Sequence, residues 1–154
     1  VLLWADVMDR YGTVKRLKNE ELELGYRTSA LERRGLFAVR AAFSLTTGDP
    51  GAIREKMEEL AAKRKEKQPL EYPSAGSTFK RPEGYFAGKL IMDAGLRGFS
   101  VGGAAVSEKH CGFVINKGNA TAADICALMD EVTRIVKEKY AVTLEPEVKK
   151  VGEF

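Results

Sequence analysis

The segment from Thr121 to Val136 constrains the fold of this 154-residue chain more than any other. Thr121 is suited to cap a helix, and Asp124 stands three residues later, where a capping box places an acid. Apolar residues then recur at helical spacing, namely Ile125, Leu128, Met129, Val132, Ile135 and Val136. A helix with one apolar face packs that face against the core, so Met129 is expected to be a core residue.

The first third of the chain is dominated by strand patterns. Val1 to Met8 and Thr13 to Lys18 are expected to form a hairpin, with Gly12 supplying a positive φ in the turn. Asn19 is expected to cap a short helical turn that ends before Gly25. Leu36 to Thr46 contains a single charge and is expected to form a largely buried strand.

Helices and strands then alternate. Asp49 and Pro50 are expected to open a helix that runs to about Lys65, with an apolar stripe of Ile53, Met57, Leu60 and Ala61. A shorter helix is expected over Phe86 to Ala94. Strands are expected at Phe99–Val106, Gly112–Ile115, Val142–Leu144 and Val148–Val151. This alternation predicts an α+β fold, a mixed sheet with packed helices.

Composition removes several classes of function. The 25 basic and 22 acidic residues are scattered in both signs, which disfavours a nucleic-acid partner. Cys111 and Cys126 lie fifteen residues apart without a second pair, so neither a zinc site nor a disulfide framework is expected. The sequence has no apolar run of about eighteen residues and no signal-peptide pattern. We therefore expect a cytoplasmic protein with no bound metal and no membrane partner.

Other motifs fail on their spacing. Gly84 to Lys89 has three residues between its glycines instead of four, and Leu90 stands where a phosphate loop needs Ser or Thr. Neither a dinucleotide-binding glycine pattern nor a GxSxG elbow around Ser77 is present. A Ser-His-Asp triad would depend on the single His110, so a hydrolase is disfavoured.

The segment Tyr72 to Pro82 (YPSAGSTFKRP) leaves two interpretations open. It combines a serine hydroxyl, a glycine and two adjacent cations, as a loop that binds an anionic substrate would. The same residue types also make ordinary surface turns. The segment alone does not choose between them.

Three segments taken together resemble one enzyme family. Gly25–Ser29 (GYRTS), Ala75–Pro82 (AGSTFKRP) and Leu144–Val148 (LEPEV) follow the order and spacing of UDP-N-acetylenolpyruvoylglucosamine reductases. These flavoenzymes reduce an enolpyruvyl ether in bacterial peptidoglycan synthesis. Further similar segments lie between them, at residues 84–98, 101–106 and 107–119. The short interval from Arg27 to Ser77 is similar to the subgroup without an extra tyrosine-bearing loop.

The resemblance implies roles for three catalytic residues. Ser77 matches the serine that delivers a proton to the substrate. Arg27 matches the arginine near the enolpyruvyl carboxylate, and Glu147 matches the active-site glutamate. It also implies that Arg81 and Lys80 lie beside the nucleotide diphosphate and that His110 lies near the nucleotide.

The resemblance also implies cofactors and a domain plan. FAD would deliver the hydride and NADPH would reduce the FAD. Residues 1–47 would be the trailing part of an FAD-binding domain, and residues 48–154 a C-terminal substrate-binding domain. Because the chain begins with Val1 and not Met, we expect a fragment whose flavin is held mainly by a preceding portion, so that no cofactor-binding residue is assigned within it.

Such a fragment is expected to be inactive alone, to bind FAD weakly, and to associate with copies of itself through apolar surface. Its partner would be the UDP-sugar substrate. The alternative is a stand-alone, non-catalytic UDP-sugar binding module. A different flavoprotein, such as an oxidase of small alcohols, should lack the GSTFKRP and PEV pair and is disfavoured.

Overall fold

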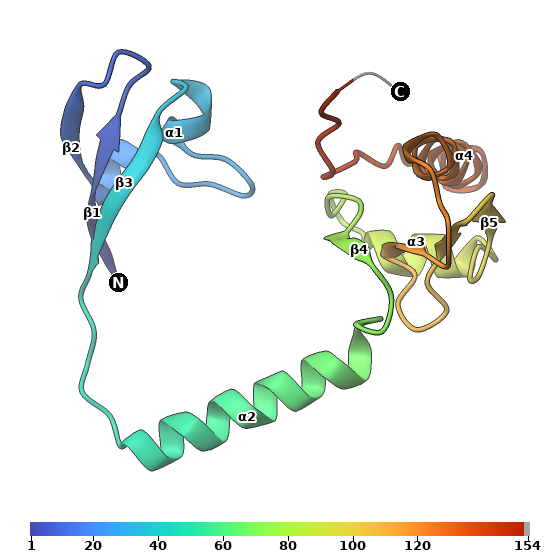
Figure 1. The fold of residues 1–154 in the computed structure, drawn as a ribbon, viewed down its shortest axis with the longest axis horizontal. Helices are drawn as coiled ribbons and strands as arrows, with labels where there is room; N and C mark the ends of the chain where they lie inside the picture. Colours follow the sequence, from blue (N-terminus) through green and yellow to red (C-terminus); the bar gives the residue numbers. More distant parts are fainter. Residues whose placement is uncertain (153–154) are drawn as a thin grey trace. The chain divides into compact units, whose positions relative to one another are not determined.

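The protein forms two compact units in its computed structural model, which describes residues 1–152 (Figure 1). The first unit spans Val1–Ile53, and the second begins at Arg54. The first contains a three-stranded sheet and the second a four-stranded sheet, in the strand orders β2-β1-β3 and β4-β7-β6-β5. All pairings of these strands are antiparallel. The predicted α+β class is confirmed, and two antiparallel sheets refine the expected mixed sheet.

The first unit is built on the predicted hairpin. β1 (Leu2–Met8) pairs with β2 (Val14–Lys18), and β3 (Phe37–Phe43) lies on the other side of β1. The Asp9 carboxylate accepts hydrogen bonds from the backbone N–H groups of Tyr11 (2.9 Å) and Thr13 (3.0 Å). Gly12 has φ +86°, the conformation that this turn requires.

A charged cluster lies in the same sheet. Asp6 is buried, and its carboxylate accepts bonds from Arg16 (2.7 Å) and Arg40 (2.6 Å) on the two flanking strands. These two guanidinium groups lower the pKa of Asp6 to about 2. The Arg16 guanidinium also lies 3.4 Å from the centre of the Trp4 ring, a close cation–π contact. The cluster joins all three strands.

The strand at Leu36–Thr46 was expected to be buried, and this prediction is wrong. β3 forms there, but only Ala42 is partly buried, and Phe37, Val39 and Phe43 are exposed. β3 pairs with β1 alone at the edge of the sheet, and no part of the described chain packs over its apolar side chains. An apolar pattern predicts a strand but does not say what covers it.

Two details of the connection from β2 to β3 also differ from expectation. The short 3-10 helix η1 (Asn19–Leu22) has Lys18, not Asn19, as its N-cap, because Asn19 donates from its side chain to the Leu2 carbonyl (2.7 Å). A single helical turn, α1 (Ala30–Arg33), was not predicted.

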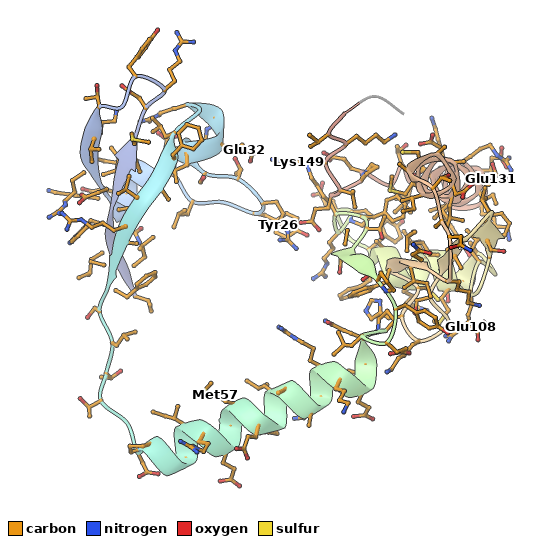
Figure 2. All side chains as sticks on the ribbon, in the orientation of Figure 1. Tyr26, Glu32, Met57, Glu108, Glu131 and Lys149 are labelled. Atoms are coloured by element: carbon orange, nitrogen blue, oxygen red, sulfur yellow. The ribbon has the colours of Figure 1, made fainter. Side chains whose placement is uncertain are left out.

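Helix α2 (Pro50–Lys67) begins as predicted and ends two residues beyond Lys65. The Asp49 carboxylate accepts a bond from the Ala52 N–H (2.7 Å), as an N-cap should. The predicted apolar stripe is present in sequence but not buried: Met57, labelled in Figure 2, is 66% exposed. Ion pairs along the helix, such as Lys63 with Glu59, support it locally instead.

The second unit contains β4 (Ser74–Ser77), α3 (Ala87–Asp93), β5 (Ser100–Val101), β6 (Ala104–Val106), β7 (Phe113–Asn116) and α4 (Ala122–Tyr140). Helix α4 confirms the strongest prediction. Thr121 and Asp124 form the capping box, with bonds of 3.1 and 2.9 Å, and the pKa of Asp124 is lowered by the bonds that it accepts. Met129 lies fully inside the core, together with Leu128, Val132 and Val136.

Other strand predictions in this unit are wrong. The strand expected at Phe99–Val106 is a hairpin, because Gly102 and Gly103 turn the chain between β5 and β6. A Cβ at Gly103 would lie 2.4 Å from the Gly118 carbonyl oxygen. The strands expected at Val142–Leu144 and Val148–Val151 do not form, and the segment makes one bridge, from Pro146 to Phe79. Strand β4 was not predicted.

Candidate functional site

Ser77 is placed by the end of strand β4. The strand pairs with β7, and Ser77 lies opposite Phe113. The pairing shifts register between Ser74 and Ser77, and Gly76 within this shift has φ +88°. Such an irregularity re-aims the strand where it occurs. Ser77 is an exposed residue, and β4 is an edge strand of its sheet.

Glu147 belongs to the extended segment that follows α4, and this segment runs beside Ser77. The Glu147 N–H donates to the Thr78 carbonyl (2.8 Å), and the Lys80 N–H donates to the Glu145 carbonyl (2.8 Å). Phe79 and Pro146 form a bridge between these two bonds. Ser77 and Glu147, seventy positions apart, therefore lie on backbone segments that are hydrogen-bonded to each other.

Thr78 fixes this arrangement, and sequence reasoning missed it. Thr78 is 2% exposed, and its hydroxyl accepts a bond from the Val114 N–H (2.9 Å). Its own N–H donates to the Gly112 carbonyl (2.8 Å), on the side away from Glu147. The sequence signal available was the large apolar Phe79 in the middle of a mostly polar segment, whereas the burial of Thr78 is a property of the fold.

The two predicted diphosphate contacts are held by local partners. Lys80 forms an ion pair with the Glu145 carboxylate. The Arg81 Nε–H donates to the Tyr85 carbonyl (3.2 Å), and its guanidinium lies 3.9 Å from the centre of the Phe86 ring. Both cationic side chains, three and four residues after Ser77, are therefore held by contacts with neighbouring groups.

His110 lies in the loop between β6 and β7. Its ring meets Phe113 edge to face, with centres 5.0 Å apart and planes at 70°. Phe113 is the residue opposite Ser77. The structure thus brings Ser77, Glu147 and His110 into one neighbourhood of the second unit, linked through β7 and Thr78.

Arg27 lies in the first unit, at the tip of a two-residue turn. Gly25 and Thr28 close the turn with backbone bonds of 3.0 and 3.4 Å. Arg27 has φ +55°, in the left-handed region that residues with a Cβ rarely adopt. Its guanidinium lies 5.9 Å from the centre of the Tyr26 ring. Its approach to Ser77 and Glu147 stays a prediction.

A cavity of about 360 Å³ borders β4 in the second unit. It is lined mainly by apolar side chains, with Thr78 and Asn116 among its polar residues.

Burial raises the pKa of Cys111, so that thiol is a poor nucleophile. Within residues 1–152, no three His, Cys, Asp or Glu side chains gather as metal ligands would.

The arrangement suits proton transfer to an anionic substrate. Ser77 offers a hydroxyl, Glu147 a carboxylate, and Lys80 and Arg81 supply positive charge within four residues of the hydroxyl. A strongly basic carbon centre accepts a proton from a hydroxyl held within hydrogen-bond reach.

None of the helices in the described part of the chain is long and apolar enough to cross a membrane.

Comparison with known proteins gives a consistent result. Residues 68–151 match the family described as UDP-N-acetylenolpyruvoylglucosamine reductase, C-terminal domain. The chain is 63% identical over 149 residues to the protein of that name from Lachnoclostridium phytofermentans, covering 97% of this chain and 48% of the relative. It is 58% identical over 154 residues to that from Agathobacter rectalis, covering 100% of this chain and 49% of the relative.

A solved structure agrees. The crystal structure of UDP-N-acetylenolpyruvylglucosamine reductase from Thermus caldophilus matches with a TM-score of 0.78 and 36% identity, over 96% of this chain and 52% of that one. The chain spans about half the length of the curated relatives that it matches.

Proposed function

This chain belongs to the UDP-N-acetylenolpyruvoylglucosamine reductase family, and on that premise we propose that it serves the flavin-dependent reduction of UDP-N-acetylglucosamine enolpyruvate to UDP-N-acetylmuramate. The reaction is a step of peptidoglycan synthesis and hence of cell-wall growth. The observation that carries the proposal is the backbone pairing of the Ser77 segment with the Glu147 segment, which supports a role for both residues in one site.

The proposed cofactors are FAD and NADPH. When bound, the FAD supplies a hydride to the outer enolpyruvyl carbon, and NADPH restores the reduced flavin. The described residues fit the substrate side of this chemistry, since Ser77 is an exposed hydroxyl followed by two cations. No residue of this chain is assigned to the flavin, which we place mainly in the half of the relatives' length that this chain does not span.

Ser77 is the proposed proton donor. Reduction leaves electron density on the carbon that bears the substrate carboxylate, and that carbon must be protonated. The placement of the hydroxyl matters more than its acidity, and the pairing of strand β4 with β7, which fixes the Ser77 backbone, supports this role. Glu147 is anchored by its backbone to the residue next to Ser77, from where it would orient the donor or the developing acid.

Arg27 is the proposed partner of the enolpyruvyl carboxylate. Its planar guanidinium offers paired N–H donors that match a carboxylate, which a lysine does less well. Arg81, Lys80 and His110 are the proposed contacts of the UDP moiety. Arg81 is the stronger candidate for the diphosphate, because its planar fork of N–H donors suits phosphate oxygens.

The domain plan is also a proposal. Residues 1–47 would be the trailing part of the FAD-binding domain, and residues 48–154 the substrate-binding domain.

We place the enzyme in the cytoplasm, where its nucleotide-sugar substrate and NADPH are available. The apolar residues exposed on β3 and α2, such as Phe43 and Met57, support some self-association of the 154-residue chain, which light scattering would detect as species larger than a monomer.

The test uses the Ser77→Ala variant of the full-length protein. Turnover, followed as NADPH oxidation with the enolpyruvyl substrate, should fall by about 10²–10⁴-fold, as expected for a lost general acid. Reduction of the flavin by NADPH without substrate should be unchanged. Ser74→Ala, which removes a hydroxyl from the same strand, is the matched control.

Three outcomes would contradict parts of the proposal. Equal turnover by the Ser77→Ala and Ser74→Ala variants would remove Ser77 from its role. Binding of the UDP-sugar without any NADPH oxidation would favour the non-catalytic binding module. A stoichiometric flavin spectrum from the purified 154-residue chain would contradict the expected weak FAD binding and inactivity of that chain.

A further inference from the structure

The loop from Ser107 to Phe113 is held by hydrogen bonds at nearly every residue. The Ser107 N–H donates to the Phe113 carbonyl (2.9 Å), and the Phe113 N–H donates to the His110 carbonyl (3.0 Å). The Ser107 hydroxyl oxygen accepts bonds from the N–H groups of Lys109 and His110, both 3.2 Å. Ser107 itself is 1% exposed. The loop, which includes Glu108 labelled in Figure 2, is therefore fixed from its buried end.

The His110 ring is fixed as well as the backbone. Its Nδ1 lies 3.1 Å from the Gly112 backbone nitrogen, and that N–H can only donate. Nδ1 must therefore be an acceptor without a hydrogen. A neutral imidazole carries one hydrogen, so here it sits on Nε2. The edge contact with Phe113 sets the ring plane.

Two glycines make room for this ring. A Cβ at Gly112 would lie 3.0 Å from the His110 Cε1 and 3.1 Å from Nδ1. A Cβ at Gly88 would lie 3.4 Å from the same Cε1 and 3.2 Å from the Gly112 nitrogen. A side chain at either position would press on the ring or on the N–H that holds it.

The loop is also tied to helix α2. The Lys109 ammonium donates to the Lys65 carbonyl (2.9 Å) in the last turn of α2 and lies 3.5 Å from the Glu71 carboxylate. A cation at that end of a helix satisfies carbonyls that lack helical partners. His110, by contrast, is exposed, and its Nε2 has no hydrogen-bond partner within residues 1–152. The loop holds firmly a ring whose one donor is unused.

We infer that Ser107 and the Gly112 N–H are positioning groups that hold the His110 ring in the orientation and tautomer whose Nε2–H donates to an oxygen acceptor of the UDP moiety. The identity of the ligand rests on the proposed function. We call the fixed orientation and tautomer of the His110 ring the lock. The lock does not rest on the proposed function, because it follows from bonds within the loop. A fixed donor also favours ligands that present an acceptor oxygen there over ligands that present an N–H, since two donors cannot pair.

The lock is tested by nitrogen NMR of the ¹⁵N-labelled full-length protein at pH 8, where an ordinary imidazole is neutral. The ring signals are assigned by their loss in His110→Gln. We expect the hydrogen on Nε2 and a hydrogen-bonded Gly112 amide. A hydrogen found on Nδ1 overturns the inference whatever the activity of the protein.

The donor role is tested by UDP and UMP affinity. His110→Phe keeps the ring contact but removes both nitrogens, and it should weaken binding about two- to tenfold, the worth of one hydrogen bond. His110→Gln keeps a side-chain N–H and should bind more tightly than the Phe variant. A deficit for UDP alone assigns the acceptor to the terminal phosphate, and a deficit for both assigns it to the UMP part. No deficit for either overturns the donor role.

The positioning role of Ser107 is tested by Ser107→Ala against Ser100→Ala, the same change at an exposed serine of β5. Ser107→Ala should shift the Gly112 amide and His110 ring signals and raise KM for the substrate about two- to tenfold, with kcat little changed. Identical spectra and KM in the two variants overturn it. A wild-type protein that binds UDP but reduces no substrate would contradict the proposed function and leave the lock standing.

Discussion

Replacing Arg27 should reveal a conformational strain in the turn that carries it. Arg27 has φ +55° between Gly25 and Thr28, a conformation that glycine adopts without cost. The informative comparison is between Arg27→Gly and Arg27→Ala, because both remove the guanidinium and all its contacts. They differ only in the Cβ, so the difference in their unfolding free energies measures the backbone alone.

The magnitude follows from two opposing effects. A left-handed conformation costs a residue with a Cβ about 1–2 kcal/mol. The greater freedom of glycine in the unfolded chain offsets about 0.4–1 kcal/mol of this. The Gly variant should therefore be more stable than the Ala variant by roughly 0.5–1 kcal/mol. At Lys15, an exposed position within strand β2, the sign should be the opposite, with Ala favoured by about 0.5–1 kcal/mol.

The assay is urea unfolding followed by the fluorescence of Trp4. This is the single tryptophan of the 154 residues, and it lies in β1, so it reports on the first unit. With a slope of about 1 kcal/mol per molar urea for a small unit, the midpoint of Arg27→Gly should lie roughly 0.5–1 M above that of Arg27→Ala. The two Lys15 variants should show the reverse order.

One result would refute the reasoning. If Ala is favoured over Gly at residue 27 as it is at residue 15, the turn in solution does not hold Arg27 in the left-handed region. If the predicted order is found, both Arg27 variants should still lose turnover to a similar degree, because the proposed carboxylate contact is absent from both. Stability would then separate the two variants while turnover would not, because they differ only in the backbone and not in the lost guanidinium.

Two further predictions concern stability away from the proposed site. Because the pKa of folded Asp6 is about 2, below its usual value near 3.8, the stabilisation from its arginines is present above about pH 4 and is lost between pH 4 and 2. Asp6→Asn should abolish that dependence in Trp4 fluorescence, and an unchanged acid transition would contradict it. Gly103→Ala should cost about 1–3 kcal/mol by circular dichroism, since its Cβ would meet backbone atoms. Gly48→Ala, at a position without positive φ whose Cβ would meet only the end of the exposed Ile53 side chain, should cost less.

Elements with strong local signals were predicted well from the sequence. The capping box of Thr121 and Asp124 and the turn at Gly12 each determine their own element through bonds between near neighbours. Strand β4 was missed for the opposite reason. Its residues SAGS have little strand preference, and it exists because β7 and the 145–147 segment pair with its neighbourhood.

The site was predictable only in part. Ser77 and Glu147 were named because of a family resemblance, while their adjacency depends on bonds between residues seventy positions apart. The setting of His110 was not visible in the sequence, because it depends on a ring nitrogen meeting a backbone N–H two residues on. The prediction that β3 and the apolar stripe of α2 would be buried failed, because apolar spacing does not identify the element that would cover them.

The bridge between Phe79 and Pro146 has a consequence for how the site opens. Within residues 1–152, the backbone bonds from 145–147 run to residues 78 and 80, not to a long ladder. Between the buried Leu144 and the partly buried Val148, so few backbone bonds allow residues 145–147 to open locally while the core around α4 stays folded. Glu147 would move with this segment and Ser77 would stay on β4. Amide hydrogen exchange at Glu147 should then be faster than in α4. The Glu147 carboxylate and the Ser77 hydroxyl would come together only while the Phe79–Pro146 bridge is formed.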